Sequence, residues 1–170
     1  MINTRTKVGE TMRNNVVKLA LIALSLAAIP AAVPAANQPA PAVYSASDGL
    51  AAGGYDVTAY FTQGKPVRGS AEHELMLQGV TWRFASADNK ARFQANPAAY
   101  APQFGGYCAW AVSQGYIASG DPEQWKIVDG KLYLNFNARA KELWEADQAD
   151  AIERGNANWP TVLTKNQDSE

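Results

Sequence analysis

The stretch that decides the fold runs from Trp125 to Asn135 and reads WKIVDGKLYLN. Two short runs rich in apolar residues, 125–128 and 131–135, flank the pair Asp129-Gly130. An Asp-Gly pair between two such runs favours a two-residue type I′ turn, because both turn positions need a positive φ. The sequence therefore predicts an antiparallel β-hairpin in this stretch.

A long helix is predicted directly after this hairpin. Asn137 is suited to cap it, because an asparagine side chain accepts hydrogen bonds from the first free N–H groups of a helix. The expected helix covers Ala138–Arg154, and Gly155 is expected to end it. Its apolar face is formed by Leu143, Trp144, Ala151 and Ile152.

A second hairpin is predicted nearer the N-terminus. Glu72–Leu77 and Val80–Ala85 both alternate between the two faces of a strand, and Gln78-Gly79 breaks the chain between them. Ser86 follows the second run and is suited to cap a further helix.

Shorter elements complete the predicted order. Tyr107–Gln114, which reads YCAWAVSQ, is predicted to be helical, and Val57–Thr62 to be a short strand or turn. Pairs of strands that alternate with helices indicate the α+β class. We expect small antiparallel hairpins packed with two or three helices.

The N-terminus predicts a signal peptide. Leu19–Ile29 is an apolar run of eleven residues, Arg13 and Lys18 lie just before it, and small residues follow it. This arrangement is typical of a secretory leader, and the run is shorter than the ~20 residues that a membrane span needs. Cleavage is expected near Ala35-Ala36, which predicts a periplasmic or secreted protein. An uncleaved N-terminal anchor is the alternative.

The expected domain organisation follows from these boundaries. Residues 1–36 form the signal peptide, with Met12 as an alternative start. Residues 37–52 are rich in Ala, Pro and Ser and predict a flexible linker. Residues 53–163 form one domain, and residues 164–170 a disordered tail.

Composition excludes several classes of function. The 170 residues include 15 Lys and Arg, 16 Asp and Glu, one Cys and one His. Removal of the leader takes away four basic residues and one acidic residue, so the remainder is mildly acidic. We therefore expect no nucleic-acid partner and no stable membrane insertion after cleavage. One Cys excludes an intramolecular disulfide and a redox pair within the chain.

Cys108, at the end of the motif GGYC, is the first candidate for chemistry. The exposed N–H groups at the start of a helix favour a thiolate, which suits a soft metal or redox chemistry. The alternative is a buried Cys that packs as a small apolar residue. His73 is either a metal ligand or a strand-surface side chain, and Asp56 either binds a cation or caps a turn.

Three motifs together resemble the YHS domain, in particular its exported single-domain bacterial branch. They read YD and AYF within 55–61, WRFAS at 82–86 and GGYC at 105–108, and the resemblance covers about Gly53–Pro160. It implies a small α+β fold and an association with heavy metals, notably copper. The metal-associated relatives carry three Cys at other positions than Cys108, but this chain has no Cys in the segment 56–59, and Ala85 and Asn89 stand at the other two positions. Their thiolate site is therefore not carried over.

Three functional interpretations remain open. The first is a periplasmic module that binds a copper-like metal ion or a metal-bearing cofactor. Its expected metal ligands are Cys108, His73, Asp56 and Tyr60, and its expected cofactor contacts are Tyr107 and Trp110. The second is a thiol-dependent redox protein that uses Cys108 with a partner thiol. The third is a structural domain with a buried Cys. An enzymatic activity is open, and binding is favoured over it.

Overall fold

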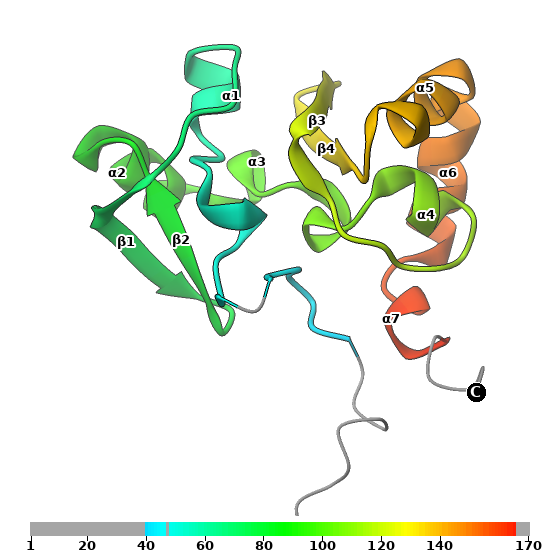
Figure 1. The fold of residues 1–170 in the computed structure, drawn as a ribbon, viewed down its shortest axis with the longest axis horizontal. Helices are drawn as coiled ribbons and strands as arrows, with labels where there is room; N and C mark the ends of the chain where they lie inside the picture. Colours follow the sequence, from blue (N-terminus) through cyan, green and yellow to red (C-terminus); the bar gives the residue numbers. More distant parts are fainter. Residues whose placement is uncertain (1–39, 47, 166–170) are drawn as a thin grey trace, which may run out of the picture. The chain divides into compact units, whose positions relative to one another are not determined.

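A computed structural model describes residues 40–46 and 48–165 (Figure 1). All of these belong to Val33–Glu170, one of two compact units of the chain. The other unit, Met1–Ala32, lies outside the described residues, and so does the signal peptide predicted at 1–36. Of the tail predicted at 164–170, residues 164 and 165 are described as the end of a helix.

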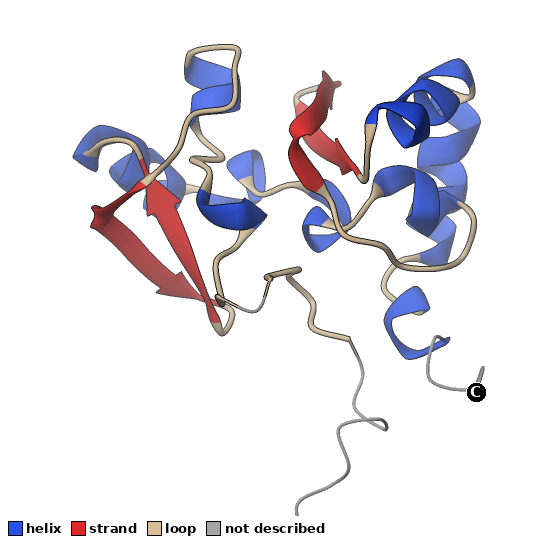
Figure 2. Cartoon of the chain, viewed as in Figure 1, coloured by secondary structure: helices blue, strands red, loops and turns tan. Residues whose placement is uncertain are grey.

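The described residues form an α+β fold, as predicted, with two separate two-stranded antiparallel sheets (Figure 2). One sheet pairs β1 (Ser70–Leu77) with β2 (Val80–Phe84), and the other pairs β3 (Asp121–Val128) with β4 (Lys131–Asn135). The helices are α1 (Ala59–Thr62), α2 (Ala87–Ala95), α3 (Pro97–Tyr100), α4 (Ala109–Ser113), α5 (Ala138–Ala146), α6 (Gln148–Asn158) and α7 (Val162–Lys165), with 3-10 turns η2 (Ala52–Gly54) and η3 (Gln103–Gly106).

Both predicted hairpins are confirmed, with the same kind of turn. Val128 pairs with Lys131, and the two residues between them, Asp129 and Gly130, have φ values of 49° and 72°. Two consecutive positive φ values in a two-residue loop define a type I′ turn. The β1–β2 turn repeats this conformation at Gln78-Gly79, with φ values of 56° and 78°.

The turn at Gly130 gives a first testable expectation. A Cβ added there would meet nothing within 4 Å, so a substitution strains only the backbone. Gly130→Val should lower the free energy of unfolding by about 1–3 kcal/mol, because a β-branched residue resists a positive φ. Gly130→Asn is the control and should cost less than half as much, because Asn tolerates this conformation. Equal melting temperatures of Gly130→Val and wild type would contradict the type I′ turn.

The predicted long helix 138–154 is wrong in its length, because two helices occupy this region. The chain breaks at Asp147, whose φ and ψ are −130° and 34°. The Asp147 carboxylate accepts a hydrogen bond from Arg154 at 2.5 Å, which links the residue at the break to the side of α6. Gly155 lies inside α6 rather than ending it. A Cβ at Gly155 would lie 2.6 Å from the buried Phe104 ring, so close packing explains the glycine.

The predicted flexible linker at 37–52 is also wrong for the residues that the structure describes. Val43 and Ala51 are buried in the core. The Tyr44 N–H donates to the Gly105 carbonyl at 2.9 Å, and the Tyr107 hydroxyl donates to the Pro41 carbonyl at 2.9 Å. Composition alone missed this packing because the hydrogen-bond partners lie more than 60 residues away in the sequence.

Two shorter predictions also need correction. For residues 57–62 the strand alternative is wrong: residues 57 and 58 form the turn that was the other alternative, and the short helix α1 follows it. The helix predicted at 107–114 begins only at Ala109, because the Cys108 side chain caps it by accepting a hydrogen bond from the Ala111 N–H. Both predicted asparagine and serine caps are confirmed: Asn137 accepts from the Ala140 N–H and Ser86 from the Asn89 N–H.

Strand β4 contributes to both apolar cores. Leu132 and Leu134 belong to the core that β2, α2 and the segment around Ala51 also form. Tyr133, between them, belongs to the other core, which includes Trp144 of α5. Successive side chains of a strand point to opposite faces, so one strand serves both cores. The chain that leaves the end of β4 is thereby held close to α4 and α5.

Among the described residues, no helix combines the length and the apolar character needed to cross a membrane.

Candidate functional site

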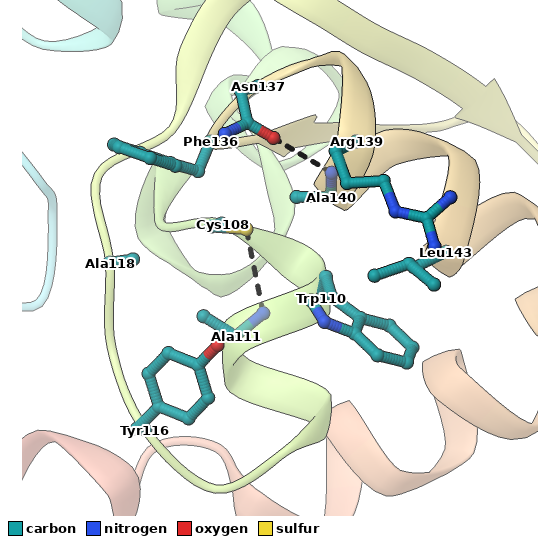
Figure 3. A pocket seen from close by; sticks show the side chains of 10 residues that line it. All are labelled: Cys108, Trp110, Ala111, Tyr116, Ala118, Phe136, Asn137, Arg139, Ala140 and Leu143. Atoms are coloured by element: carbon teal, nitrogen blue, oxygen red, sulfur yellow. Dashed lines mark hydrogen bonds between the residues drawn. The ribbon is translucent and has the colours of Figure 1, made fainter.

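A pocket lies between α4, the loop that follows it and the first turns of α5 (Figure 3). Its volume is about 370 Å³. This is at the small end of the roughly 300–1,000 Å³ that is typical of sites for small molecules. The residues that line it are Cys108, Trp110, Ala111, Tyr116, Ala118, Phe136, Asn137, Arg139, Ala140 and Leu143.

Hydrogen bonds between α4 and β4 fix one side of the pocket. The Trp110 N–H donates to the Asn135 side-chain oxygen at 3.1 Å, and Cys108 forms an isolated bridge with Leu134. The Cys108 N–H also donates to the Ala118 carbonyl at 2.9 Å, which closes the loop after α4 against its start. This wall of the pocket is therefore held by hydrogen bonds to β4 and to the loop that follows α4.

The pocket is lined mainly by small and by aromatic side chains. Three alanines, Ala111, Ala118 and Ala140, take up little volume and leave the space open. Trp110, Tyr116 and Phe136 lie around it in the close view (Figure 3). Tyr116 and Phe136 are 46% and 52% exposed, which is unusual for large aromatic residues. The pocket thus offers apolar surface that is not covered by the protein itself.

Cys108 lines the pocket, but its side chain is buried and hydrogen-bonded within the protein. Its side chain is buried, with 1% of the residue exposed. The sulfur accepts a hydrogen bond from the Ala111 N–H at 3.5 Å, and the thiol donates to the Asn135 side-chain oxygen at 3.8 Å. The thiol acts as a helix cap in this arrangement, which matches the structural interpretation better than the redox interpretation.

The two predicted cofactor contacts differ in position. Trp110 lines the pocket, as the interpretation requires. Tyr107 does not: it is 3% exposed, and its ring packs against Tyr44 with centroids 5.3 Å apart. Burial raises the pKa of the Tyr107 phenol, so it remains a neutral hydrogen-bond donor to the Pro41 carbonyl.

Asp56 caps a turn, which was the alternative to a role in cation binding. Its carboxylate is completely buried and accepts four hydrogen bonds. The donors are the N–H groups of Thr58, Ala59 and Ala85 and the side-chain amide of Asn89, at 2.8, 3.3, 2.9 and 2.7 Å. Both carboxylate oxygens are therefore occupied by the protein's own donors.

Tyr60 and His73 do not complete a metal site either. The Tyr60 hydroxyl donates to the Pro122 carbonyl at 2.9 Å, and burial strongly raises the pKa of this phenol, which disfavours the phenolate that would bind a metal. His73 lies in β1 and is half-buried. In the described part of the chain, no group of three or more His, Cys, Asp or Glu is placed to hold a metal ion. Within the described residues, the expected ligand set is therefore not brought together as a site for a copper-like ion.

Cys108 gives a second testable expectation. Cys108→Ala removes the cap of α4 and should lower the free energy of unfolding by about 1–2 kcal/mol. Cys108→Ser should cost less than about 1 kcal/mol, because a hydroxyl can make both hydrogen bonds of the thiol. Neither Zn(II) nor Cu(I) should raise the melting temperature of wild type. A rise with either metal that disappears in Cys108→Ser would contradict this expectation and support the metal interpretation.

Sequence reasoning did not assign eight of the ten lining residues to a site: Ala111, Tyr116, Ala118, Phe136, Asn137, Arg139, Ala140 and Leu143. One signal was present at Phe136, which directly precedes the helix cap Asn137. An apolar residue at that position normally packs against an apolar residue in the second turn of the helix. Here the corresponding residue is Lys141, and Phe136 is 52% exposed and lines the pocket.

Comparisons with protein-family models, with curated proteins and with solved structures found no match for this chain. The resemblance to YHS domains therefore stays a prediction that rests on the three motifs.

Proposed function

We propose that this protein is a binding module that takes a small organic molecule in the pocket between α4 and α5. The observation that carries the proposal is the pocket itself, about 370 Å³ in volume and bordered by the exposed aromatic rings of Tyr116 and Phe136. Burial of these rings under a ligand would remove apolar surface from water, which favours binding.

The proposal keeps the binding module expected from the sequence and replaces the ion by an organic ligand. The four expected metal ligands are not gathered into one site, whereas the pocket walls are largely apolar. Among the residues that line the pocket, the nucleophile Cys108 is buried and hydrogen-bonded, which favours binding over thiol chemistry. The leader predicted at 1–36 supports a periplasmic or secreted location for this module.

The test of this function is binding of N-phenyl-1-naphthylamine, a neutral aromatic molecule that fluoresces when it leaves water. Wild type should bind it at one saturable site. Ala140→Phe should weaken binding about ten-fold or more, because the new ring fills the space that an alanine leaves open. Ala146→Phe is the matched control: Ala146 is exposed at the far end of the same helix and does not line the pocket.

The control should bind the probe within about two-fold of wild type, a difference of well under 1 kcal/mol. Cooperative melting of both variants at temperatures close to that of wild type would show that neither is unfolded. Unchanged binding in Ala140→Phe, or the absence of saturable binding in wild type, would contradict the proposed function.

A further inference from the structure

The charged groups at the pocket are positive, which indicates the charge of a ligand that would fit there. Arg139 is the charged residue among those that line it, and no Asp or Glu is among them. The first turn of α5, which begins at the pocket, also contains no acidic residue. The helix of nine residues therefore presents the positive end of its dipole to the pocket, and the carboxylate that pairs with Arg139, that of Glu142, lies in the second turn.

The guanidinium of Arg139 is available to a ligand. It pairs with Glu142 at 3.2 Å, but the two side chains are 72% and 67% exposed. Ion pairs in such exposed positions contribute little to stability, because water and salt screen them. A ligand can therefore draw Arg139 away from Glu142 at little cost. The close view shows the Arg139 side chain running beside Leu143, so a charged group and an apolar wall lie next to each other (Figure 3).

From these observations we propose that the pocket selects an amphipathic ligand with a flat aromatic body and one anionic oxygen group. The aromatic body would lie among Trp110, Tyr116 and Phe136, and the anionic group would face Arg139. A carboxylate and a sulfonate share the required chemistry, since the guanidinium donates to oxygen pairs of either kind. This inference rests on the proposed function, because it names the ligand class of the same pocket.

A matched pair of probes tests the charge. N-phenyl-1-naphthylamine and 1-anilinonaphthalene-8-sulfonate share their two ring systems and differ by one sulfonate. Wild type should bind the sulfonate about five-fold more tightly than the neutral probe, which is the scale of one exposed charge contact. The preference should shrink in 0.5 M NaCl, because salt screens exposed charges.

Substitution of Arg139 assigns the preference to this residue. Arg139→Gln should bring the two probes to equal affinity, and Arg139→Glu should make the neutral probe the tighter one. Lys141→Gln removes a positive charge two residues further along the same helix, from a residue that does not line the pocket, and should keep the preference. A preference that survives in Arg139→Glu would overturn the inference.

Displacement of the bound sulfonate by two carboxylates tests whether the apolar body of the ligand must be aromatic. 2-Naphthoate should displace it at a lower concentration than octanoate, because the pocket is bordered by rings. A stronger effect of octanoate would overturn the aromatic part of the inference and indicate a lipid-like ligand.

The outcomes also separate the inference from the function on which it rests. Equal binding of both probes by wild type, lost in Ala140→Phe, would leave the proposed function standing and overturn the charge selection. Binding of either probe that is unaffected by Ala140→Phe would overturn both. Probe binding that appears only where the protein self-associates, as measured by light scattering, would also overturn both, since the exposed rings would then be joining copies of the chain.

Discussion

Asp56→Ala is expected to lower the free energy of unfolding by about 3–5 kcal/mol, the largest effect of any single polar substitution proposed here. The substitution leaves four donors without their acceptor. Three of them, the N–H groups of Thr58 and Ala59 and the side-chain amide of Asn89, belong to buried residues, and a buried donor without a partner costs about 1–3 kcal/mol. The carboxylate also connects the start of α1 with the start of α2, so its loss should loosen both.

Asp48→Ala is the matched control for this prediction. Asp48 makes the same kind of turn, accepting a hydrogen bond from the N–H two residues later, but at an exposed position. Its loss should cost no more than about 1 kcal/mol, because water replaces the missing acceptor. Asp56→Asn should fall between the two, since the amide keeps one oxygen but turns an N–H group toward the donors. Chemical unfolding measures all three, and equal losses for Asp48→Ala and Asp56→Ala would contradict the structural role of Asp56.

Gly105→Ala is expected to lower the free energy of unfolding by about 2–4 kcal/mol. Gly105 has a φ of 61°, and a Cβ there would lie 1.9 Å from the Ala42 carbonyl oxygen. The Gly105 carbonyl also accepts the hydrogen bond of the Tyr44 N–H. An alanine therefore strains the backbone and forces the segment at 40–44 off the domain.

A shortened chain separates the cost of backbone strain at residue 105 from the cost of displacing residues 40–44. Gly115 has a φ of 86°, and the nearest atom to an added Cβ lies at 3.9 Å, so Gly115→Ala reports backbone strain alone. In a chain that begins at Ser45, the clashing carbonyl is gone, so the cost of Gly105→Ala should fall to that of Gly115→Ala plus a small contribution from the Trp159 ring, which lies 3.3 Å from the added Cβ. An undiminished cost of Gly105→Ala in the shortened chain would show that residues 40–44 do not pack against Gly105.

The elements that could be predicted from sequence are those that neighbouring residues define. Asp129-Gly130 forms the expected turn, and Ser86 and Asn137 cap the expected helices, since each interaction joins residues within three positions. The role of Asp56 as a turn cap was also among the sequence-based alternatives for the same reason. The break at Asp147 was missed, because the apolar spacing of Leu143, Trp144, Ala151 and Ile152 fits one helix as well as two.

The candidate site was predictable only in part. Cys108 and Trp110 were singled out by their motif and do line the pocket. The grouping of Cys108 with His73, Asp56 and Tyr60 was not found, because residue type says what a side chain can bind and not which side chains it meets. Tyr116 and Arg139 come from a loop and a helix that are brought together by the packing of α4 against α5.

The sequence by itself determined the α+β class, the two hairpins with their turns and the helix caps. These depend on backbone conformations and hydrogen bonds between residues a few positions apart, so the local residues are sufficient. The tertiary structure decided that residues 40–44 pack onto the domain, that Gly155 serves close packing against Phe104, and that a pocket opens beside Cys108. Each of these depends on which surfaces of distant parts of the chain meet. The hydrophobic effect rewards any burial of apolar area and is non-directional, so residue type alone does not say which surfaces pair.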